Sequence, residues 1–140
     1  MNRKNPTFTN DAEKTNDYHD AFSFYEYSED KIEISIHITD LSSVVIPGDK
    51  LFDEAEGRIS SVYTIEESVP MFPELLSNDM FSLKAGEERR VFSYNFIISK
   101  NGIWKLTNVV QQIISVWENL SYENADRLIH DDSEFWGLLY

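Results

Sequence analysis

The stretch Ile32-Glu33-Ile34-Ser35-Ile36-His37-Ile38-Thr39 decides the fold of this chain. Isoleucine alternates with a polar residue at every step, which is the period-2 pattern of a β-strand with one apolar side. His37 falls on the side opposite the isoleucines, so we expect it to be a half-exposed strand residue. The pattern predicts a sheet as the framework of the domain.

The segments on either side extend this sheet. Ala21 to Tyr27 is rich in aromatic residues and predicts a strand that forms a hairpin with the isoleucine strand. Arg89 to Ser99 alternates apolar and polar residues in the same way, and Lys100-Asn101-Gly102 turns the chain into a further strand from Ile103.

Two helices are predicted between and after these strands. Asp49 opens one that reaches about Ser61, with one apolar side formed by Leu51, Phe52, Ala55 and Ile59. Ser121 is a candidate N-cap for another helix that runs through 128–129. A last helical pattern begins at Asp132 and stops at Tyr140 after little more than one turn, so we expect a truncated element there.

These segments predict an α+β fold: a mixed, mainly antiparallel sheet with packed helices. The 140 residues suit one domain, spanning 1–140, in which residues 1–7 are expected to be flexible. There is no cysteine, no signal peptide and no apolar run of membrane-spanning length. We therefore expect a cytoplasmic protein without membrane partners.

The charge of the chain limits its ligands. There are 12 basic and 25 acidic residues, and the formal net charge is −13. Proteins gain much of their affinity for nucleic acids from Lys and Arg side chains that displace counterions from phosphates. The chain alone is therefore expected to bind RNA weakly, and no DNA binding is expected.

Four residues near the N-terminus could form a metal site: Asp11, Asp17, His19 and Asp20. Crowded carboxylates repel one another unless a cation lies among them, and oxygen ligands of this kind suit Mg²⁺. Imidazole suits transition metals better, which makes His19 the unusual member. On spacing alone, a polar solvated loop is the alternative interpretation.

With these motifs in order, the sequence resembles the catalytic RNB domain of the ribonuclease II and ribonuclease R family, in its N-terminal part. The match begins near Phe8 and runs to the end of the chain at almost ungapped spacing. The matching motifs are Asp11, Asp17-Tyr18-His19-Asp20-Ala21, Ile36 to Ser42, Pro47-Gly48, Arg58 to Tyr63, Pro70 to Glu74, Leu76-Ser77, Ser82-Leu83, Gly86-Glu87 and Leu120 to Glu123.

The resemblance implies 3′→5′ hydrolysis of single-stranded RNA to nucleoside 5′-monophosphates, assisted by Mg²⁺ or Mn²⁺. Carried over to this chain, Asp11, Asp17 and Asp20 would be catalytic metal ligands. Tyr63 and Tyr122 match aromatic positions that stack near the bound RNA, where one base is worth roughly 1–3 kcal/mol. Ordinary packing with a surface hydroxyl is the alternative for both tyrosines.

Two departures from the family pattern predict weak activity or none in the chain alone. His19 stands where the family has an aspartate important for catalysis, so one oxygen ligand and one negative charge are missing. The family domain also continues for roughly twice this length. A non-catalytic remnant that binds proteins, or one piece of a split ribonuclease completed by a partner chain, is therefore the alternative function. Exposed aromatic side chains are expected if another polypeptide covers this one: Trp104, Trp117, Phe135 and Trp136.

Overall fold

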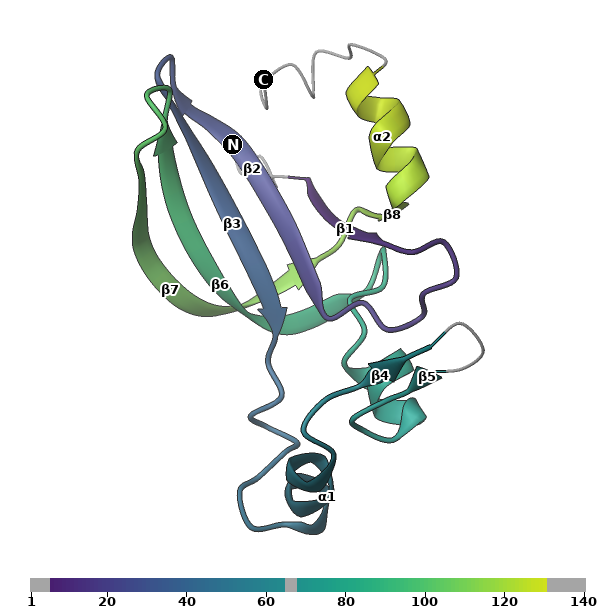
Figure 1. Cartoon of the computed structure of the whole chain (residues 1–140). Coiled ribbons are helices and arrows are strands. Elements are labelled where there is room, and N and C mark those ends of the chain that lie inside the picture. Colours follow the sequence, from purple (N-terminus) through teal and green to yellow (C-terminus); the bar gives the residue numbers. More distant parts are fainter. Residues whose placement is uncertain (1–5, 65–67, 131–140) are drawn as a thin grey trace.

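The computed structural model describes residues 6–64 and 68–130 and contains one six-stranded sheet (Figure 1). Its strand order is β7-β6-β3-β2-β1-β8. The strands are β1 (Thr7–Asp11), β2 (Asp20–Ser28), β3 (Lys31–Thr39), β6 (Glu88–Ser99), β7 (Trp104–Ser115) and β8 (Glu118–Ser121). Thr7 is the first residue of β1 and is buried, so the stretch expected to be flexible does not include it.

All neighbouring strands run antiparallel except β1 and β8, which are parallel. The predicted hairpin of β2 and β3 is present, with Phe22 opposite Ile36. The predicted pair β6 and β7 is also present and includes a bulge at Asn95 and Phe96. The mixed, mainly antiparallel α+β fold is thus confirmed, whereas β1 and β8 were not predicted.

Both predicted helices are present in the described chain. Helix α1 (Lys50–Arg58) begins at an N-cap formed by Asp49, whose Oδ1 accepts a hydrogen bond from the amide of Phe52 at 2.8 Å. It ends three residues earlier than expected, because Ile59 adopts a left-handed φ of 68°. Ile59 is 81% exposed, so its assignment to the apolar side of the helix is wrong.

Helix α2 (Tyr122–His130) follows β8 directly and packs on β8 and β1. The predicted cap is confirmed, because Ser121 Oγ accepts a hydrogen bond from the amide of Asn124 at 3.2 Å. The helical pattern predicted from Asp132 lies outside the described residues. None of the described helices is long and apolar enough to cross a membrane.

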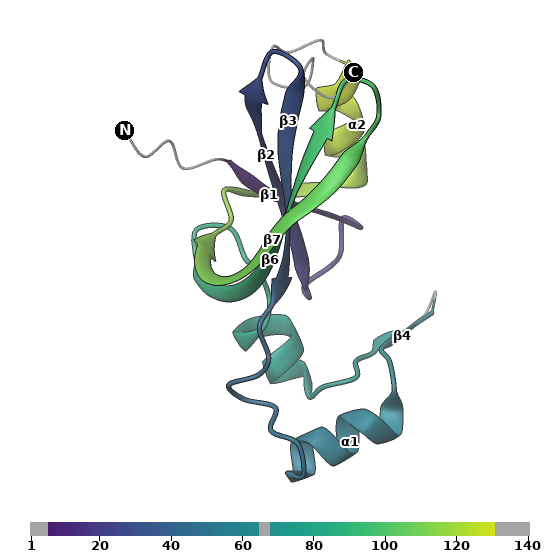
Figure 2. The ribbon, with the colours of Figure 1, turned by 90° about the vertical axis from the view of Figure 1, so that its left-hand side faces the viewer.

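Residues 41–64 and 68–84 form a small lobe below the sheet, inserted between β3 and β6 (Figures 1 and 2). It contains α1, the short strands β4 (Val62–Tyr63) and β5 (Ser68–Val69), and a π-helical turn, Leu76–Met80. Its core is Ala55, Phe72 and Phe81, and the rings of Phe72 and Phe81 meet edge to face at 5.7 Å. The lobe therefore has its own apolar core.

The sheet contributes two further cores. Phe8, Phe24 and Leu120 bring together β1, β2 and β8. Ala21, Leu83, Val91 and Val116 form the other core, in which Leu83 is completely buried. Because Leu83 lies at the end of the lobe segment, this core fixes the lobe to the sheet.

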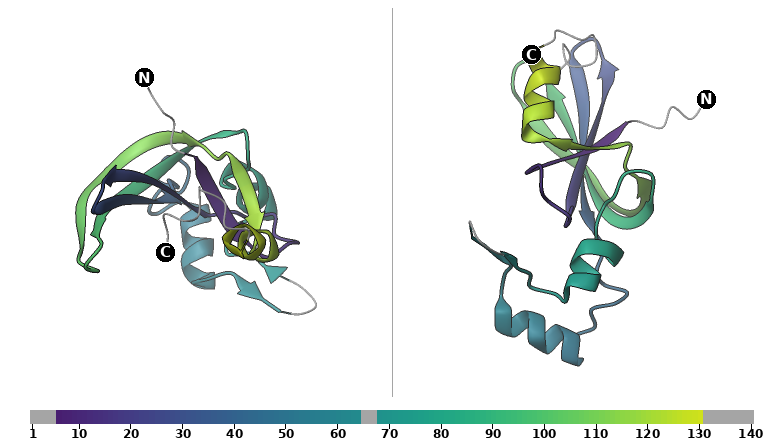
Figure 3. Two further views of the ribbon diagram at one scale, coloured as in Figure 1. Left: turned by 90° about the horizontal axis from the view of Figure 1, so that it is seen from above. Right: turned by 90° about the vertical axis from the view of Figure 1, so that its right-hand side faces the viewer.

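The side of the isoleucine strand that carries His37 is buried, contrary to the expectation, and part of the isoleucine side is exposed. His37 is only 3% exposed, whereas Ile36 and Ile38 are 40% and 41% exposed. The sheet is strongly curved, with β6 and β7 bending along their length (Figures 1 and 3). The polar side of β3 is packed against Ser23 of β2 and Ser93 of β6, both of which are also buried. The expectation that His37 is half exposed is therefore wrong.

Candidate functional site

The predicted metal ligands surround the connection between β1 and β2. Asp11 is the last residue of β1, Asp20 is the first residue of β2, and Asp17 and His19 lie in the loop between them. Because β1 and β2 are neighbouring antiparallel strands, the loop brings Asp11 and Asp20 to the same end of the sheet. We call Asp11, Asp17, His19 and Asp20 the acidic cluster.

Backbone contacts with the lobe hold this loop in place. The Ser82 hydroxyl accepts a hydrogen bond from the amide of Tyr18 at 3.1 Å and donates one to the carbonyl of Asn16 at 2.9 Å. The amide of Leu83 donates to the carbonyl of Tyr18 at 2.7 Å. Ser82 and Leu83 are both buried, so these contacts are shielded from water and position the loop firmly.

His19 is tied to the lobe on one side and to the sheet on the other. Its Nε2 lies 3.4 Å from the carbonyl oxygen of Ser77. A carbonyl only accepts, so Nε2 is the donor in this long contact. The amide and the hydroxyl of Thr39 both donate to the carbonyl of His19, at 3.1 and 3.2 Å.

The electrostatics show that the acidic cluster is close enough for its members to interact. The pKa of Asp11 is raised above its ordinary value, first by partial burial and then by the negative charge of Asp20 and, less strongly, of Asp17. A hydrogen bond from Thr9 and the charge of His19 act in the opposite direction. Ionised Asp11 is thus repelled by its neighbours, which is the situation that a bound cation relieves.

The acidic cluster offers the negative charge and the oxygen ligands that a divalent cation needs, but its side chains lie too far apart to hold one ion together. Across residues 6–64 and 68–130, no three His, Asp or Glu side chains lie close enough together to hold one metal ion. The structure therefore brings the acidic cluster into one electrostatic neighbourhood without forming a closed coordination shell. The assignment of Asp11, Asp17 and Asp20 as metal ligands remains a prediction.

The predicted RNA-stacking residues occupy different places. Tyr122 is the first residue of α2 and is 55% exposed. It follows Ser121, which pairs with Asp11 in the parallel register of β1 and β8. Because Asp11 belongs to the acidic cluster, this pairing places the backbone of Tyr122 next to the cluster. Tyr63 lies in β4 of the lobe, and its side chain is outside the described part of the structure.

Asn119 supports the acidic cluster and was not identified from the sequence. Its Nδ2 donates hydrogen bonds to the Thr9 hydroxyl and to the carbonyl of Leu83, both at 2.9 Å. Its Oδ1 accepts one from the amide of Ala85 at 2.8 Å. Asn119 thus links β8 to β1 and to the end of the lobe. No sequence signal marks a residue that acts through contacts with such distant segments.

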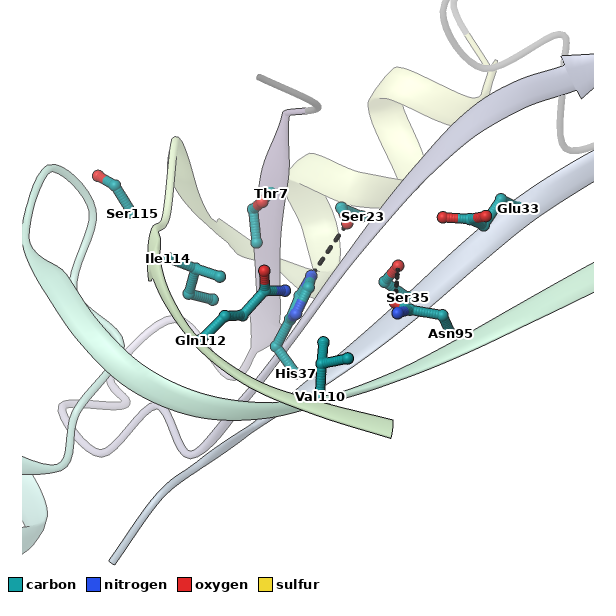
Figure 4. Close-up of a pocket in the computed structure, with 10 residues that line it drawn as sticks. All are labelled: Thr7, Ser23, Glu33, Ser35, His37, Asn95, Val110, Gln112, Ile114 and Ser115. Atoms are coloured by element: carbon teal, nitrogen blue, oxygen red, sulfur yellow. Dashed lines mark hydrogen bonds between the residues drawn. The ribbon is translucent and has the colours of Figure 1, made fainter. Parts of the chain in front are cut away.

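A polar pocket of about 340 Å³ lies on the side of the sheet that carries His37 (Figure 4). Its lining residues come from β1, β2, β3, β6 and β7. His37 Nε2 lies 2.9 Å from Ser23 Oγ, and its Nδ1 lies 2.7 Å from Ser93 Oγ. Gln112 Nε2 donates to the same Ser93 oxygen at 2.7 Å. Burial lowers the pKa of His37 to about 4, so this imidazole is neutral at pH 7.

Comparisons with known proteins agree in pointing to one family. The family model described as "RNB domain" matches residues 2–136. The chain is 32% identical over 132 residues to "Ribonuclease R 2" of Lactococcus lactis, which covers 94% of this chain and 20% of that protein. The chain spans 20% or less of the length of the curated relatives that it matches.

Solved structures show the same fold. Mycoplasma genitalium RNase R in complex with double-stranded RNA matches with a TM-score of 0.85 at 24% identity, covering 94% of this chain and 23% of that one. Yeast Ssd1, described as a pseudonuclease, matches with a TM-score of 0.81 at 22% identity, covering 92% of this chain and 16% of that one.

Proposed function

The chain belongs to the RNB domain family, and we propose that it provides the acidic metal-binding part of an exoribonuclease catalytic domain. The RNB-domain homologues named ribonuclease R are 3′→5′ exoribonucleases. The proposed activity of the assembled domain is hydrolysis of single-stranded RNA to nucleoside 5′-monophosphates. Because the chain spans a fifth or less of its curated relatives, we propose that it is weakly active or inactive alone.

The observation that carries this proposal is the placement of Asp11 and Asp20 at the same end of two neighbouring strands, where the pKa of Asp11 is raised first by burial and then by the charge of Asp20. The family as a whole requires a divalent cation, and Asp11, Asp17 and Asp20 would hold it here. We propose Mg²⁺, with Mn²⁺ as the second choice, because all three donors are hard carboxylate oxygens. When bound, such an ion supplies positive charge at the scissile phosphate and lowers the pKa of a water molecule.

The protein's own residues prepare this site in two ways. Thr9 hydrogen-bonds to the Asp11 side chain, and Asn119 in turn donates to Thr9. Together they orient one carboxylate before any cation arrives. The contacts of Tyr18 with Ser82 and Leu83 set the path of the loop that carries Asp17. The open spacing would close by small movements of this loop around the ion.

His19 is the reason for proposing low activity. It replaces an oxygen donor, and its Nε2 is engaged with the carbonyl of Ser77. An imidazole neither adds negative charge nor offers the oxygen that Mg²⁺ prefers. Loss of one well-placed charged group in a catalytic site costs orders of magnitude in rate.

RNA would reach the cluster past Tyr122, whose exposed ring could stack on a base. The net charge of −13 opposes RNA, so the assembled protein must supply basic side chains from outside these 140 residues. We therefore propose single-stranded RNA as the substrate of the assembled protein, held only weakly by this chain.

A non-catalytic role is the second candidate, either as an interaction module or as one piece of a split ribonuclease. Two observations favour it. The acidic cluster contains His19 in place of a carboxylate and is not closed around one ion. The chain also exposes large apolar side chains, including Trp104 at 66% and Trp117 at 64%. Surfaces of this kind are typical of protein interfaces.

Titration calorimetry with Mg²⁺, together with a labelled single-stranded RNA, tests the proposal. We expect weak Mg²⁺ binding that Asp20→Asn abolishes. The matched control Asp30→Asn changes an exposed aspartate beyond the other end of β2 and should leave binding intact. We expect the isolated chain not to shorten the RNA. Equal binding by both variants would overturn the metal assignment, and processive shortening lost in Asp20→Asn would overturn the proposed inactivity.

A further inference from the structure

One side of the outer half of the sheet is apolar and uncovered. We call Ile36, Ile38, Tyr94, Trp104, Val109 and Ile113 the apolar sheet face. The register places Ile36 opposite Tyr94, and Tyr94 opposite Val109, so β3, β6 and β7 form one continuous row on the same side. The six side chains are between 38% and 66% exposed.

The rest of the described chain does not bury this face. Helix α2 packs at the other end of the sheet, on β8 and β1 (Figure 1). The lobe lies below the sheet rather than over it (Figure 2). Soluble proteins seldom expose a contiguous apolar patch of this kind unless it meets a partner.

The adjoining edge of the sheet is also open. Strand β7 ends the strand order, and within residues 6–64 and 68–130 its outer backbone groups have no partner strand. From Asn108 to Ser115 it contains no charged residue and no proline. Natural edge strands usually carry such residues to prevent pairing, so this edge is suited to accept another strand.

Two kinds of partner could cover this face: a second copy of the chain or a different polypeptide. The net charge of the chain favours the second. A second copy would bring another net charge of −13 against the first, which opposes close association. A partner with a basic rim would be attracted instead. The comparisons supply a candidate, because the matched region is only 23% of the Mycoplasma genitalium RNase R chain and 16% of the yeast Ssd1 chain. Those proteins contain ample further polypeptide to cover the face.

We propose that the apolar sheet face and the open edge of β7 are the docking surface for the remaining polypeptide of an RNB protein. The partner presents an apolar layer to the face, a strand to the edge and basic side chains at the rim. This inference rests on the proposed function for the identity of the partner. It does not depend on whether the acidic cluster binds a metal.

A chimera provides the test. Ribonuclease R 2 of Lactococcus lactis is produced with its matching segment replaced by this chain, and thermal unfolding is followed in the chimera and in the isolated chain. The test variant is Ile36→Lys/Val109→Lys, which places two charges on the apolar sheet face. The control is Ile46→Lys, which changes a 57% exposed residue of the lobe.

We expect the test variant to unfold near the wild-type temperature in the isolated chain, because both positions are partly exposed there. In the chimera the same variant should lower the unfolding temperature by several degrees, whereas Ile46→Lys should change neither protein. A chimera that tolerates both variants equally, or that does not fold, overturns the inference. So does an isolated chain that forms a dimer sensitive to Ile36→Lys/Val109→Lys. A folded chimera whose replaced segment contributes no Mg²⁺ binding would count against the proposed function alone.

Discussion

His37 of β3 and Ser93 of β6 are direct partners in the sheet register, and Nδ1 of His37 lies 2.7 Å from Ser93 Oγ. With Ser23 on its other nitrogen, the imidazole has one hydroxyl at each end. A neutral imidazole offers one donor and one acceptor nitrogen, so both hydroxyls can be satisfied. Protonation would instead leave a buried positive charge without a counter-ion among these partners.

Stability is therefore expected to fall as the pH decreases from about 6.5 to about 4. The pKa of His37 is about 4 in the folded chain and about 6.5 when unfolded, so the unfolded state binds the extra proton in this range. The contribution is complete above pH 6.5 and amounts to about 3 kcal/mol. Urea unfolding at several pH values measures it. His37→Asn should remove this part of the slope, and an unchanged slope would contradict the prediction.

Asp40 is expected to stabilise the junction between the sheet and the lobe. Its carboxylate accepts hydrogen bonds from the amide and hydroxyl of Ser42, at 2.9 and 2.6 Å, and from Gln111 Nε2 at 2.5 Å. Asp40→Asn replaces an acceptor with a donor facing these donors and should cost about 1.5–3 kcal/mol. Chemical denaturation measures the loss, with the exposed Asp30→Asn as the control. Equal stability of the two variants would refute the assignment.

Asp40 should also affect acid unfolding in a separate pH range. Its pKa is lowered mainly by the hydrogen bond from the Ser42 hydroxyl, with smaller contributions from Gln111 and Arg90. A carboxylate whose pKa is lowered by folding stabilises the fold at every pH above its ordinary, unfolded pKa. This contribution is lost as the pH falls through the folded pKa. The effect begins below about pH 4, where the contribution of His37 is already lost. Asp40→Asn should reduce the pH dependence of the free energy of unfolding only in this acidic range.

Asp11→Asn is expected to stabilise the metal-free chain at neutral pH. The raised pKa of Asp11 means that its ionised form is disfavoured by burial and by Asp20 and Asp17. Above the folded pKa this penalty is fully present, and an uncharged amide removes it while retaining an acceptor oxygen for Thr9. Thermal unfolding with EDTA tests the gain. Adding Mg²⁺ should then stabilise the wild type and not the variant; a variant less stable than wild type in EDTA would disprove the repulsion.

His19→Asp should restore the missing oxygen donor and tighten Mg²⁺ binding by about tenfold, which corresponds to 1.4 kcal/mol. The substitution also removes the contact with the Ser77 carbonyl, which is long at 3.4 Å and contributes little. Isothermal calorimetry compares the two proteins. His19→Ala is the control, because it removes the imidazole without adding an oxygen ligand or a charge, and it should leave affinity near wild type. No difference between the variants would argue that the acidic cluster does not form a site.

The regular elements could be predicted because their signals are local. Alternation in 32–39 and 89–99 identified two central strands, and Asp49 and Ser121 identified the helix starts. Strand β1 was missed because Thr7–Asp11 is short and its parallel partner β8 is 110 positions away, with Phe8 paired to Glu118. Propensity carries no information about such a pairing.

The sequence was enough to predict which residues form the acidic cluster, but not the contacts that they make. Asp11, Asp17, His19 and Asp20 share one short connection, so their proximity follows from the sequence. The engagement of His19 with Ser77 depends on the lobe, which packs against the loop from a distant part of the chain. The burial of His37 depends on sheet curvature, which alternation does not encode. Alternation separates the two sides of a strand without telling which side the fold encloses.

The parallel pairing of β1 with β8 also determines when the acidic cluster can be completed during synthesis. Strand β1 leaves the ribosome before the strand that covers its outer edge, which follows 110 residues later. At 5–20 residues per second, this delay is on the order of 10 s. Until then Asp11 lies at the end of an unpaired edge, and Asn119 is not yet available to orient Thr9. The acidic cluster therefore reaches its final arrangement only after the strands of the central hairpins have been synthesised.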